Sequence, residues 1–388
     1  MKRMLPLLLV WFGAAALRAG PLPFVNGTQN GALVWTNEIP DATYRVLGLV
    51  NSGDYHATWQ QAQGLQMPTN GELRVPAPTE FGVLRLTHLP PAGMALVEAG
   101  EVVRGSGEAA EEMPIHTNFI DSFYVDRIEV PFALWDRVRR WGLTNGYTDL
   151  PPGDSGWIQS PPAPNSASNH PVVNINWYDA LKWCNARSEA EGLDPAIRMP
   201  FTADVFRTGE IDNPVLDLLA MGYRLPTEAE WEKAARGGPV LNHYPWPSLG
   251  GRPADHLDAT RANYVSSADL YEAGTTPAGW YNGSQWIVVG FIRFPGRDMA
   301  NGYGLYDMAG NVSEWCWDWY DGAYYDNRVY ENPTGPDSSI FGRVVRGGDW
   351  YSDANWLRCA ARAYDGAYEL RNYRGFRCVR RASVISGP

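Results

Sequence analysis

The sequence predicts an α+β domain that is rich in loops and has few helices, preceded by a small all-β domain. Three observations support this architecture. The 388 residues include 40 glycines and 30 prolines, which favour turns, and 17 tryptophans and 20 tyrosines, which can fill a core. Short runs typical of strands occupy residues 20–90. Helix start signals occur at only a few places after residue 94, so a helical bundle is not expected.

The first 19 residues have the pattern of a signal peptide. Lys2 and Arg3 precede an apolar run from Met4 to Leu17, and small residues follow, with cleavage expected after Ala19. The alternative interpretation is a buried strand or helix. The run is too short for a good membrane span, and no later uncharged segment reaches spanning length. We therefore expect an exported protein, periplasmic or extracellular, without a transmembrane anchor.

Residues 20–90 are predicted to form the small β domain. Glycine, proline and asparagine separate four short β-rich runs, at 31–36, 44–50, 71–75 and 81–87. The segment LPPAG at 89–93 is typical of a linker, so the second domain is predicted over 94–381.

The second domain is predicted to begin with two strands, at 94–105 and 119–130, and to continue with a helix. Pro131 suits the first helical position, where no backbone N–H is needed. The apolar residues that follow at three-residue steps are Phe132, Trp135, Val138 and Trp141. A proline-rich loop is expected over about 150–170.

Two more helices have clear boundary signals. Asn176 is a candidate N-cap and Gly192 a stop, with a buried face at Trp177, Ala180, Leu181 and Cys184. Thr227 and Glu230 form a capping box, in which each side chain bonds the other residue's backbone N–H, and Gly237 ends that helix. From residue 250 onward the sequence predicts loops and short strands.

Charge and cysteine content limit the possible functions. The net charge of −11 argues against a nucleic-acid partner, because phosphate binding needs a basic surface. In an exported protein, the four cysteines favour two disulfides, and free buried thiols are the alternative. The sequence contains no Cys-x-x-Cys motif and no Cys/His cluster, so a zinc site is not expected.

Five motifs occur in a fixed order between Met94 and Arg381. They are MALVEAG with FYVDRIEV (94–100 and 123–130), HPVVNINWYDA (170–180), YRLPTEAEWE (223–232), NGYGLYDMAGNVSEW (301–315), and RVVRGGDW with GFR (343–350 and 375–377). In this order they resemble the formylglycine-generating enzyme, or sulfatase-modifying factor, family. The resemblance implies a formylglycine-generating-enzyme-like variant of the C-type lectin fold. It does not fix an activity, because one fold hosts many functions.

The redox pair of these enzymes is missing. The family oxidises a sulfatase cysteine with two cysteines of its own, placed shortly after the Gly-Gly pair. Here Ser352 stands at the first of those positions, and the second falls in a gap around 354–357. A hydroxyl cannot replace a thiolate as a copper ligand, so we expect no catalytic residue and no copper site. Retained oxidase activity, or different chemistry in the same cleft, is the alternative.

The resemblance also implies structural calcium and disulfides. Asp307 and Glu314 offer carboxylates and Gly310 and Val312 offer carbonyls, a mixture that suits calcium. The alternative is a surface loop whose carboxylates cap turns. A second family site maps more loosely onto Asn263, Tyr264, Asp269 and Tyr271. The family's first bridge corresponds to Cys184–Cys378. The second has lost one position, which leaves Cys316–Cys359, or two free thiols.

The segment that lacks the redox pair is rich in residues typical of recognition surfaces. This C-terminal region lies on the ligand face of C-type-lectin-like folds and resembles the variable region of retroelement-diversified lectin-fold proteins. We expect it to bind a protein, peptide or glycan, although the aromatic residues alone could simply pack a loop-rich fold. A diversified binding protein is a further alternative. The candidate ligand-binding residues are Trp350, Tyr351, Asp353, Asn355, Trp356, Tyr364, Asp365, Tyr368, Asn372 and Tyr373.

Overall fold

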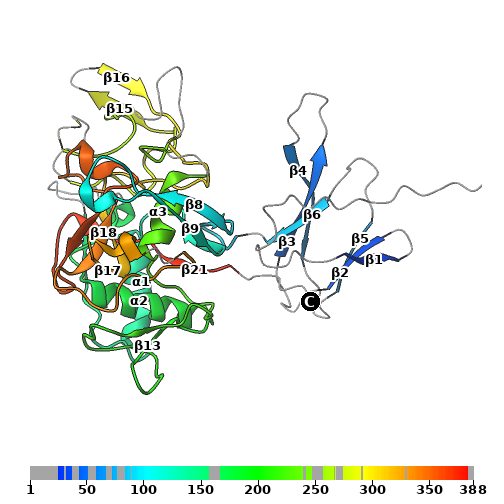
Figure 1. The fold of residues 1–388 in the computed structure, drawn as a ribbon, viewed down its shortest axis with the longest axis horizontal. Coiled ribbons are helices and arrows are strands. Elements are labelled where there is room, and N and C mark those ends of the chain that lie inside the picture. The colour runs from blue at the N-terminus through cyan, green and yellow to red at the C-terminus, as the bar shows by residue number, and fades with distance from the viewer. Residues whose placement is uncertain are drawn as a thin grey trace, which may run out of the picture. The chain divides into compact units, whose positions relative to one another are not determined.

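The protein is described by a computed structural model in which the chain divides into two compact units, 1–91 with 383–388, and 92–382. The structure describes residues 25–29, 32–36, 43–50, 58–66, 72–76, 84–88, 90–156, 167–238, 242–246, 257–265, 267, 274–289, 292–327 and 330–382. The predicted signal peptide, residues 1–19, lies outside them. Each unit is considered by itself (Figure 1).

The described part of the first unit consists of antiparallel strands in two sheets, ordered β1-β2-β5 and β4-β3-β6. The strands are β1 (Val25–Gln29), β2 (Ala32–Thr36), β3 (Thr43–Val50), β4 (Thr58–Gln66), β5 (Glu72–Pro76) and β6 (Leu84–His88). The four predicted runs correspond to β2, β3, β5 and β6. The other two strands, β1 and β4, were not predicted from the sequence.

The described part of the second unit is built from short strands and loops around three helices (Figure 1). Its strands are β7 (Met94–Val97), β8 (Gly100–Arg104), β9 (His116–Ile120), β10 (Phe123–Asp126), β11 (Asp154–Ser155), β12 (Val172–Val173), β13 (Ile197–Arg198), β14 (Val215–Leu216), β15 (Trp286–Val289), β16 (Ile292–Pro295), β17 (Ser313–Trp319), β18 (Arg343–Arg346), β19 (Ala363–Asp365), β20 (Arg374–Gly375) and β21 (Val379–Arg381). Each of the two long strands predicted at 94–105 and 119–130 is therefore wrong in extent, because a turn divides each segment.

Two sheets join distant parts of this unit. In one, ordered β21-β10-β7, the C-terminal β21 pairs antiparallel with β10. The other is ordered β19-β18-β17-β20, with β20 parallel to β17 and the other pairs antiparallel. The four-stranded sheet brings the GGD turn after β18 close to residues 363 and 374. The α+β, loop-rich class with few helices is confirmed.

The helices lie where the sequence signals predict them, with one difference at the start of α1. They are α1 (Phe132–Leu143), α2 (Trp177–Ala190) and α3 (Glu228–Arg236), and the single 3-10 turns are η1 (Ala110–Glu112), η2 (Ala167–Asn169), η3 (Tyr324–Asn327) and η4 (Ala354–Leu357). The predicted capping box at Thr227 and Glu230 is present, and Gly237 ends α3 at φ 68°. Asn176 caps α2 in the same way, with Asp179 as its partner. Pro131 is the N-cap of α1 and not its first helical residue.

Helix α2 is buried on every side, which corrects the prediction of one buried face. Its residues from Trp177 to Ser188 are all buried, polar ones included. The polar side chains have internal partners. Asn185 donates to the carbonyls of Ile197 and Phe206, and Arg187 pairs with Asp126 at 2.8 Å. These bonds offset the cost of removing the polar groups from water.

A network of buried charges joins α3 to β8 and β18. The carboxylate of Glu232 accepts from Arg104, Arg236 and Arg346 at 3.2, 2.6 and 2.9 Å. Glu228 likewise binds Arg362. Because each of these side chains is nearly inaccessible to water, the pairs hold the helix in register with both sheets. Among the described residues, no helix is both long enough and apolar enough to cross a membrane.

Candidate functional site

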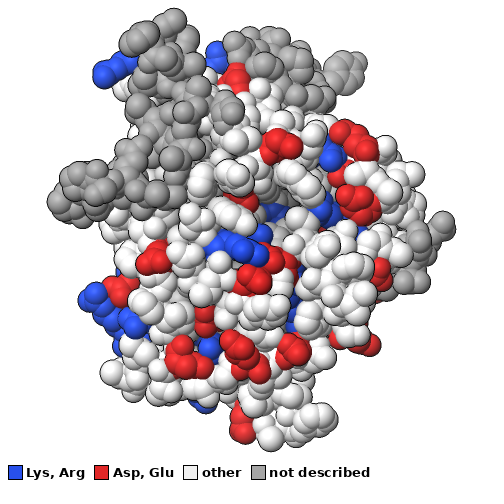
Figure 2. Space-filling model, turned by 90° about the vertical axis from the view of Figure 1, so that its left-hand side faces the viewer, with Lys and Arg blue, Asp and Glu red and all other residues white. Residues whose placement is uncertain are grey.

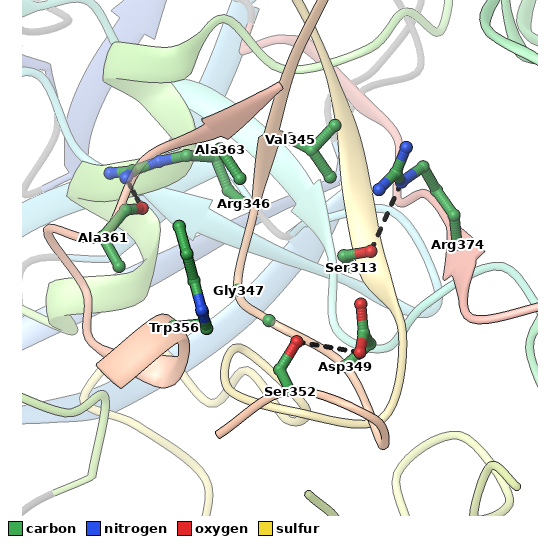
Figure 3. A pocket seen from close by; sticks show the side chains of 11 residues that line it. Ser313, Val345, Arg346, Gly347, Asp349, Ser352, Trp356, Ala361, Ala363 and Arg374 are labelled. Carbon is green, nitrogen blue, oxygen red and sulfur yellow. Dashed lines mark hydrogen bonds between the residues drawn. The ribbon is translucent and has the colours of Figure 1, made fainter. Parts of the chain in front are cut away.

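A pocket of about 190 Å³ lies at the end of the four-stranded sheet (Figure 3). Residues from all four strands of that sheet line it, together with the turn after β18 and the short helix η4. The lining residues are Ser313, Val345, Arg346, Gly347, Gly348, Asp349, Ser352, Trp356, Ala361, Ala363 and Arg374.

The turn that forms the pocket requires its two glycines. Gly347 and Gly348 have φ values of 94° and 66°, in the left-handed region that favours glycine. A Cβ on Gly348 would lie 2.8 Å from Leu357 Cδ1 and 3.0 Å from the carbonyl oxygen of Trp356. The turn therefore depends on glycine both for its conformation and for its close contact with η4. Asp349, the residue after the two glycines, lines the pocket.

Asp349 is the central polar group of the pocket. Its Oδ1 accepts from the Ser352 hydroxyl at 2.8 Å and from the backbone N–H of Tyr351 at 3.1 Å. Figure 3 shows its other oxygen directed away from Ser352. Burial raises the pKa of Asp349, while hydrogen bonds from Ser352 and Ser313 and the charge of Arg374 oppose that rise.

The two arginines that line the pocket are already engaged. Arg374 forms an ion pair with Asp365, and its Nε donates to the Ser313 hydroxyl at 3.3 Å. Arg346 pairs with Glu232 at 2.9 Å and donates to backbone carbonyls of the chain that follows η4. Both guanidinium groups therefore support the walls of the pocket.

The structure places most of the predicted ligand-binding residues at the surface. Exposed are Tyr351, Asp353, Asn355, Trp356, Tyr364, Tyr368 and Asn372, whereas Trp350, Asp365 and Tyr373 are half-buried. Tyr351, Trp356 and Tyr368 are 67%, 44% and 67% exposed, large fractions for aromatic side chains. Of these ten residues, Trp356 lines the pocket, next to Ser352. Tyr364 instead packs against Tyr320 and Phe341.

The four cysteines lie in the core and away from the pocket lining. All are buried free thiols, and Cys184 Sγ lies 3.6 Å from Cys378 Sγ. Burial raises the pKa of Cys359 to about 12 and that of Cys316 well above its usual value. A thiol with so high a pKa is a poor source of thiolate. The two disulfides remain predictions. No S–S bond is formed in either pair, although Cys316 and Cys359 belong to the same core cluster.

Three carboxylates gather around one arginine near the first predicted calcium position. Glu314 accepts from Arg377 Nε at 2.9 and 2.8 Å, and Asp307 Oδ2 accepts from the N–H of Gly279 at 2.5 Å. Glu129, which the sequence reasoning missed, binds the N–H of Val312 at 3.1 Å. Burial, then repulsion from Asp307 and Glu314, raises the pKa of Glu129, and burial raises that of Asp307 to about 6.

The second predicted calcium position contains an unsatisfied oxygen. Asn263 is buried, and its Oδ1 has no hydrogen-bond partner among the described residues. Its carbonyl accepts from Asn311, and the Gly310 Cα lies against it. Tyr264 is half-buried, and Asp269 and Tyr271 lie outside the described residues. Within the described ranges, no group of three or more His, Cys, Asp or Glu side chains is arranged to hold a metal.

The sequence reasoning also missed Asp349, Arg374 and Ser313 as pocket residues. Asp349 directly follows the GG pair of one motif, and Arg374 directly precedes the GF pair of another. These positions were the sequence signal that could have identified them as pocket residues. Only the pairing of β17 with β20 brings Ser313 and Arg374 together.

Comparison with known proteins shows which family the chain resembles. A family model described as the sulfatase-modifying factor enzyme 1-like domain matches residues 82–382. The serine/threonine-protein kinase pkn1 of Chlamydia caviae is 31% identical over 298 residues, which cover 74% of this chain and 38% of that protein. This chain therefore spans less than half the length of that relative.

Two further relatives are matched over most of their length. The formylglycine-generating enzyme of Streptomyces coelicolor is 31% identical over 306 residues, covering 73% of this chain and 86% of the enzyme. The solved structure of Treponema denticola variable protein 1 has a TM-score of 0.56 and 27% identity, covering 74% of this chain and 95% of that one. The family model and these matches show that the chain belongs to the sulfatase-modifying factor family and has its variant of the C-type lectin fold.

Proposed function

We propose that this protein is an exported binding member of the family without cysteine oxidase activity, and that it binds a protein, peptide or glycan through the face formed by residues 350–373. One observation carries the proposal. The pocket at the position of the redox pair is lined by Asp349, Ser352 and Trp356, and none of its lining residues is a cysteine. Exposed aromatic and amide side chains beside it supply the rigid and adaptable contacts of a recognition surface.

The absence of oxidase activity gives a direct prediction. Purified full-length protein is expected to bind no Cu(I) and to leave a Cys-x-Pro-x-Arg peptide unoxidised, because its four cysteines are buried and none of them lines the pocket. Mass spectrometry of the peptide, with an active formylglycine-generating enzyme as positive control, measures this. Copper-dependent conversion of the cysteine to an aldehyde would contradict the proposal and support the oxidoreductase alternative.

The binding face gives a second prediction. Peptide and glycan arrays probed with the full chain are expected to identify ligands whose affinity falls about tenfold in Tyr351→Ala, Trp356→Ala or Tyr368→Ala. Leu219→Ala is the matched control, because Leu219 is 71% exposed and lies outside this face. Equal affinity in all four variants would exclude the face as the binding surface.

Structural calcium is proposed at both sequence-predicted positions. Support comes from the unsatisfied Asn263 Oδ1 and from three carboxylates that share one arginine, since oxygen donors with excess negative charge suit calcium. Calcium at about 100 times its Kd is expected to add about 2.7 kcal/mol to the free energy of unfolding. Thermal melts with calcium, magnesium or a chelator measure the effect, and equal melting temperatures in all three would count against both sites.

A retroelement-diversified binding protein is the second candidate, and the likeness to the Treponema denticola variable protein 1 favours it. In that case the genome is expected to hold a reverse transcriptase gene beside a near-copy of the 3′ end of this gene. Differences between the copies should then fall within residues 350–373.

A further inference from the structure

The pocket contains a buried carboxylate without an ionic partner. Asp349 is 6% exposed, and among the described residues it accepts hydrogen bonds from hydroxyl and N–H groups but forms no ion pair. A carboxylate removed from water in this way lacks a compensating charge. Arg374 acts on Asp349 through its charge but is ion-paired with Asp365, and Arg346 is ion-paired with Glu232, so a cationic ligand would supply the first ion pair of Asp349.

One wall of the pocket is apolar, while Ser313, Ser352 and the two arginines supply its other polar groups. Val345, Ala361 and Ala363 line it with methyl groups, and the indole of Trp356, which is 44% exposed, stands opposite Asp349 and Arg374 in Figure 3. A chain of methylenes ending in a cation fits both parts of the pocket, and an aromatic face also attracts cations.

We propose that the pocket takes one lysine or arginine side chain of a peptide or protein partner. The methylene stem packs against Val345, Ala361 and Ala363, and the cation pairs with the Asp349 carboxylate. This assignment rests on the proposed binding function and names the ligand chemistry of the same face.

The overall charge favours such a partner. The chain has 43 acidic and 32 basic residues, and Figure 2 shows acidic side chains spread over one face of the molecule. A net charge of −11 attracts a basic partner at long range and speeds association at low ionic strength. The pocket then selects one basic side chain at short range.

The test uses four small probes on the full-length protein. These are the Nα-acetyl N-methylamides of lysine and arginine and of their uncharged counterparts norleucine and citrulline, titrated by ligand-observed NMR. We expect each basic probe to bind at least about tenfold more tightly than its neutral counterpart, because only the cation can pair with Asp349. In Asp349→Asn this preference should disappear, while binding of norleucine stays the same.

Two further variants separate charge from packing. Asp337→Asn removes an exposed carboxylate that does not line the pocket, and it should retain the preference for basic probes. Trp356→Ala should weaken basic and neutral probes alike. The comparison of lysine with norleucine in the unmodified protein, and the Asp337→Asn result, remain decisive even if Asp349→Asn fails to fold.

The outcomes distinguish this assignment from the binding function on which it rests. If array ligands bind the 350–373 face but lysine and arginine bind no better than norleucine and citrulline, the basic-side-chain assignment is overturned and the binding function stands. If a preference for basic probes survives in a folded Asp349→Asn protein, the assignment to Asp349 is also overturned. If neither arrays nor probes bind, both proposals fail.

Discussion

Replacing Glu232 with glutamine is expected to lower the free energy of unfolding by about 3–5 kcal/mol. Glu232 is fully buried, and its carboxylate is bonded by Arg104, Arg236 and Arg346 and by the backbone N–H of Gly105. The amide has almost the same shape but carries no charge. Three guanidinium groups would then lose their shared anion in a region that water does not reach.

Urea denaturation of the full-length protein measures this loss. Glu191→Gln is the control, because Glu191 pairs with Arg187 at 3.4 Å but its side chain is 46% exposed, where a charge contributes little. We expect that variant to lie within about 0.5 kcal/mol of the original protein. Equal losses in the two variants would show that burial does not strengthen the pairs around Glu232.

Glu232 also makes the stability of the fold depend on pH. Burial alone would raise the pKa of Glu232, but Arg104, Arg236 and Arg346 hold it well below its usual value of 4.5. A group with a lowered folded-state pKa stabilises the fold above its unfolded pKa, and this stabilisation is lost as the pH falls through the folded pKa. Between pH 5 and 3, roughly, stability should therefore fall more steeply in the original protein than in Glu232→Gln.

Replacing Trp177 with alanine is expected to cost about 3–5 kcal/mol. The indole is completely buried, its Nε1 donates to the carbonyl of Cys316 at 2.9 Å, and the Arg343 guanidinium lies 3.6 Å from the ring centroid. Alanine would leave a cavity, a carbonyl without its indole donor, and Arg343 with one aromatic partner fewer. These three losses occur at the junction of α2 and β17.

Thermal and urea unfolding of Trp177→Ala and Trp286→Ala test this expectation. Trp286 lies on β15 and is 59% exposed, so the same truncation there should cost less than about 1 kcal/mol. If both variants lose the same amount, the buried indole has no special part in the core.

The helices of the second unit were the most predictable elements, because their boundaries are set locally. Thr227 and Glu230 satisfy each other's backbone N–H groups within one turn, and Gly237 ends the helix in a conformation that few other residues adopt. The strands β1 and β4 escaped prediction since VNGTQ and TWQQAQGLQ lack the apolar alternation by which strands are recognised.

The pocket was less predictable than the exposed face beside it. Exposed aromatic and amide residues such as Tyr351 and Asn355 are marked by residue type. Asp349 and Arg374 carry no such mark, because a charged residue is usually at the surface. Here both are buried, and an ion pair with Asp365 holds Arg374 in place. Glu129 lies near Asp307 and Glu314 only because the fold brings distant parts of the chain together. The two residues are 178 (307 − 129) and 185 (314 − 129) positions away from Glu129 in the sequence.

The sequence by itself determined the family, the loop-rich α+β class, the caps of the helices and the loss of the redox cysteines, because motifs, caps and residue types are local properties. Only the tertiary structure decided that α2 is buried on every side, that Asp349 lacks an ionic partner, and that Ser313, Asp349 and Arg374 share one pocket. The pairing of β17 with β18 and β20 sets these relations. The physical reason is that burial and charge compensation depend on which distant segments pack together.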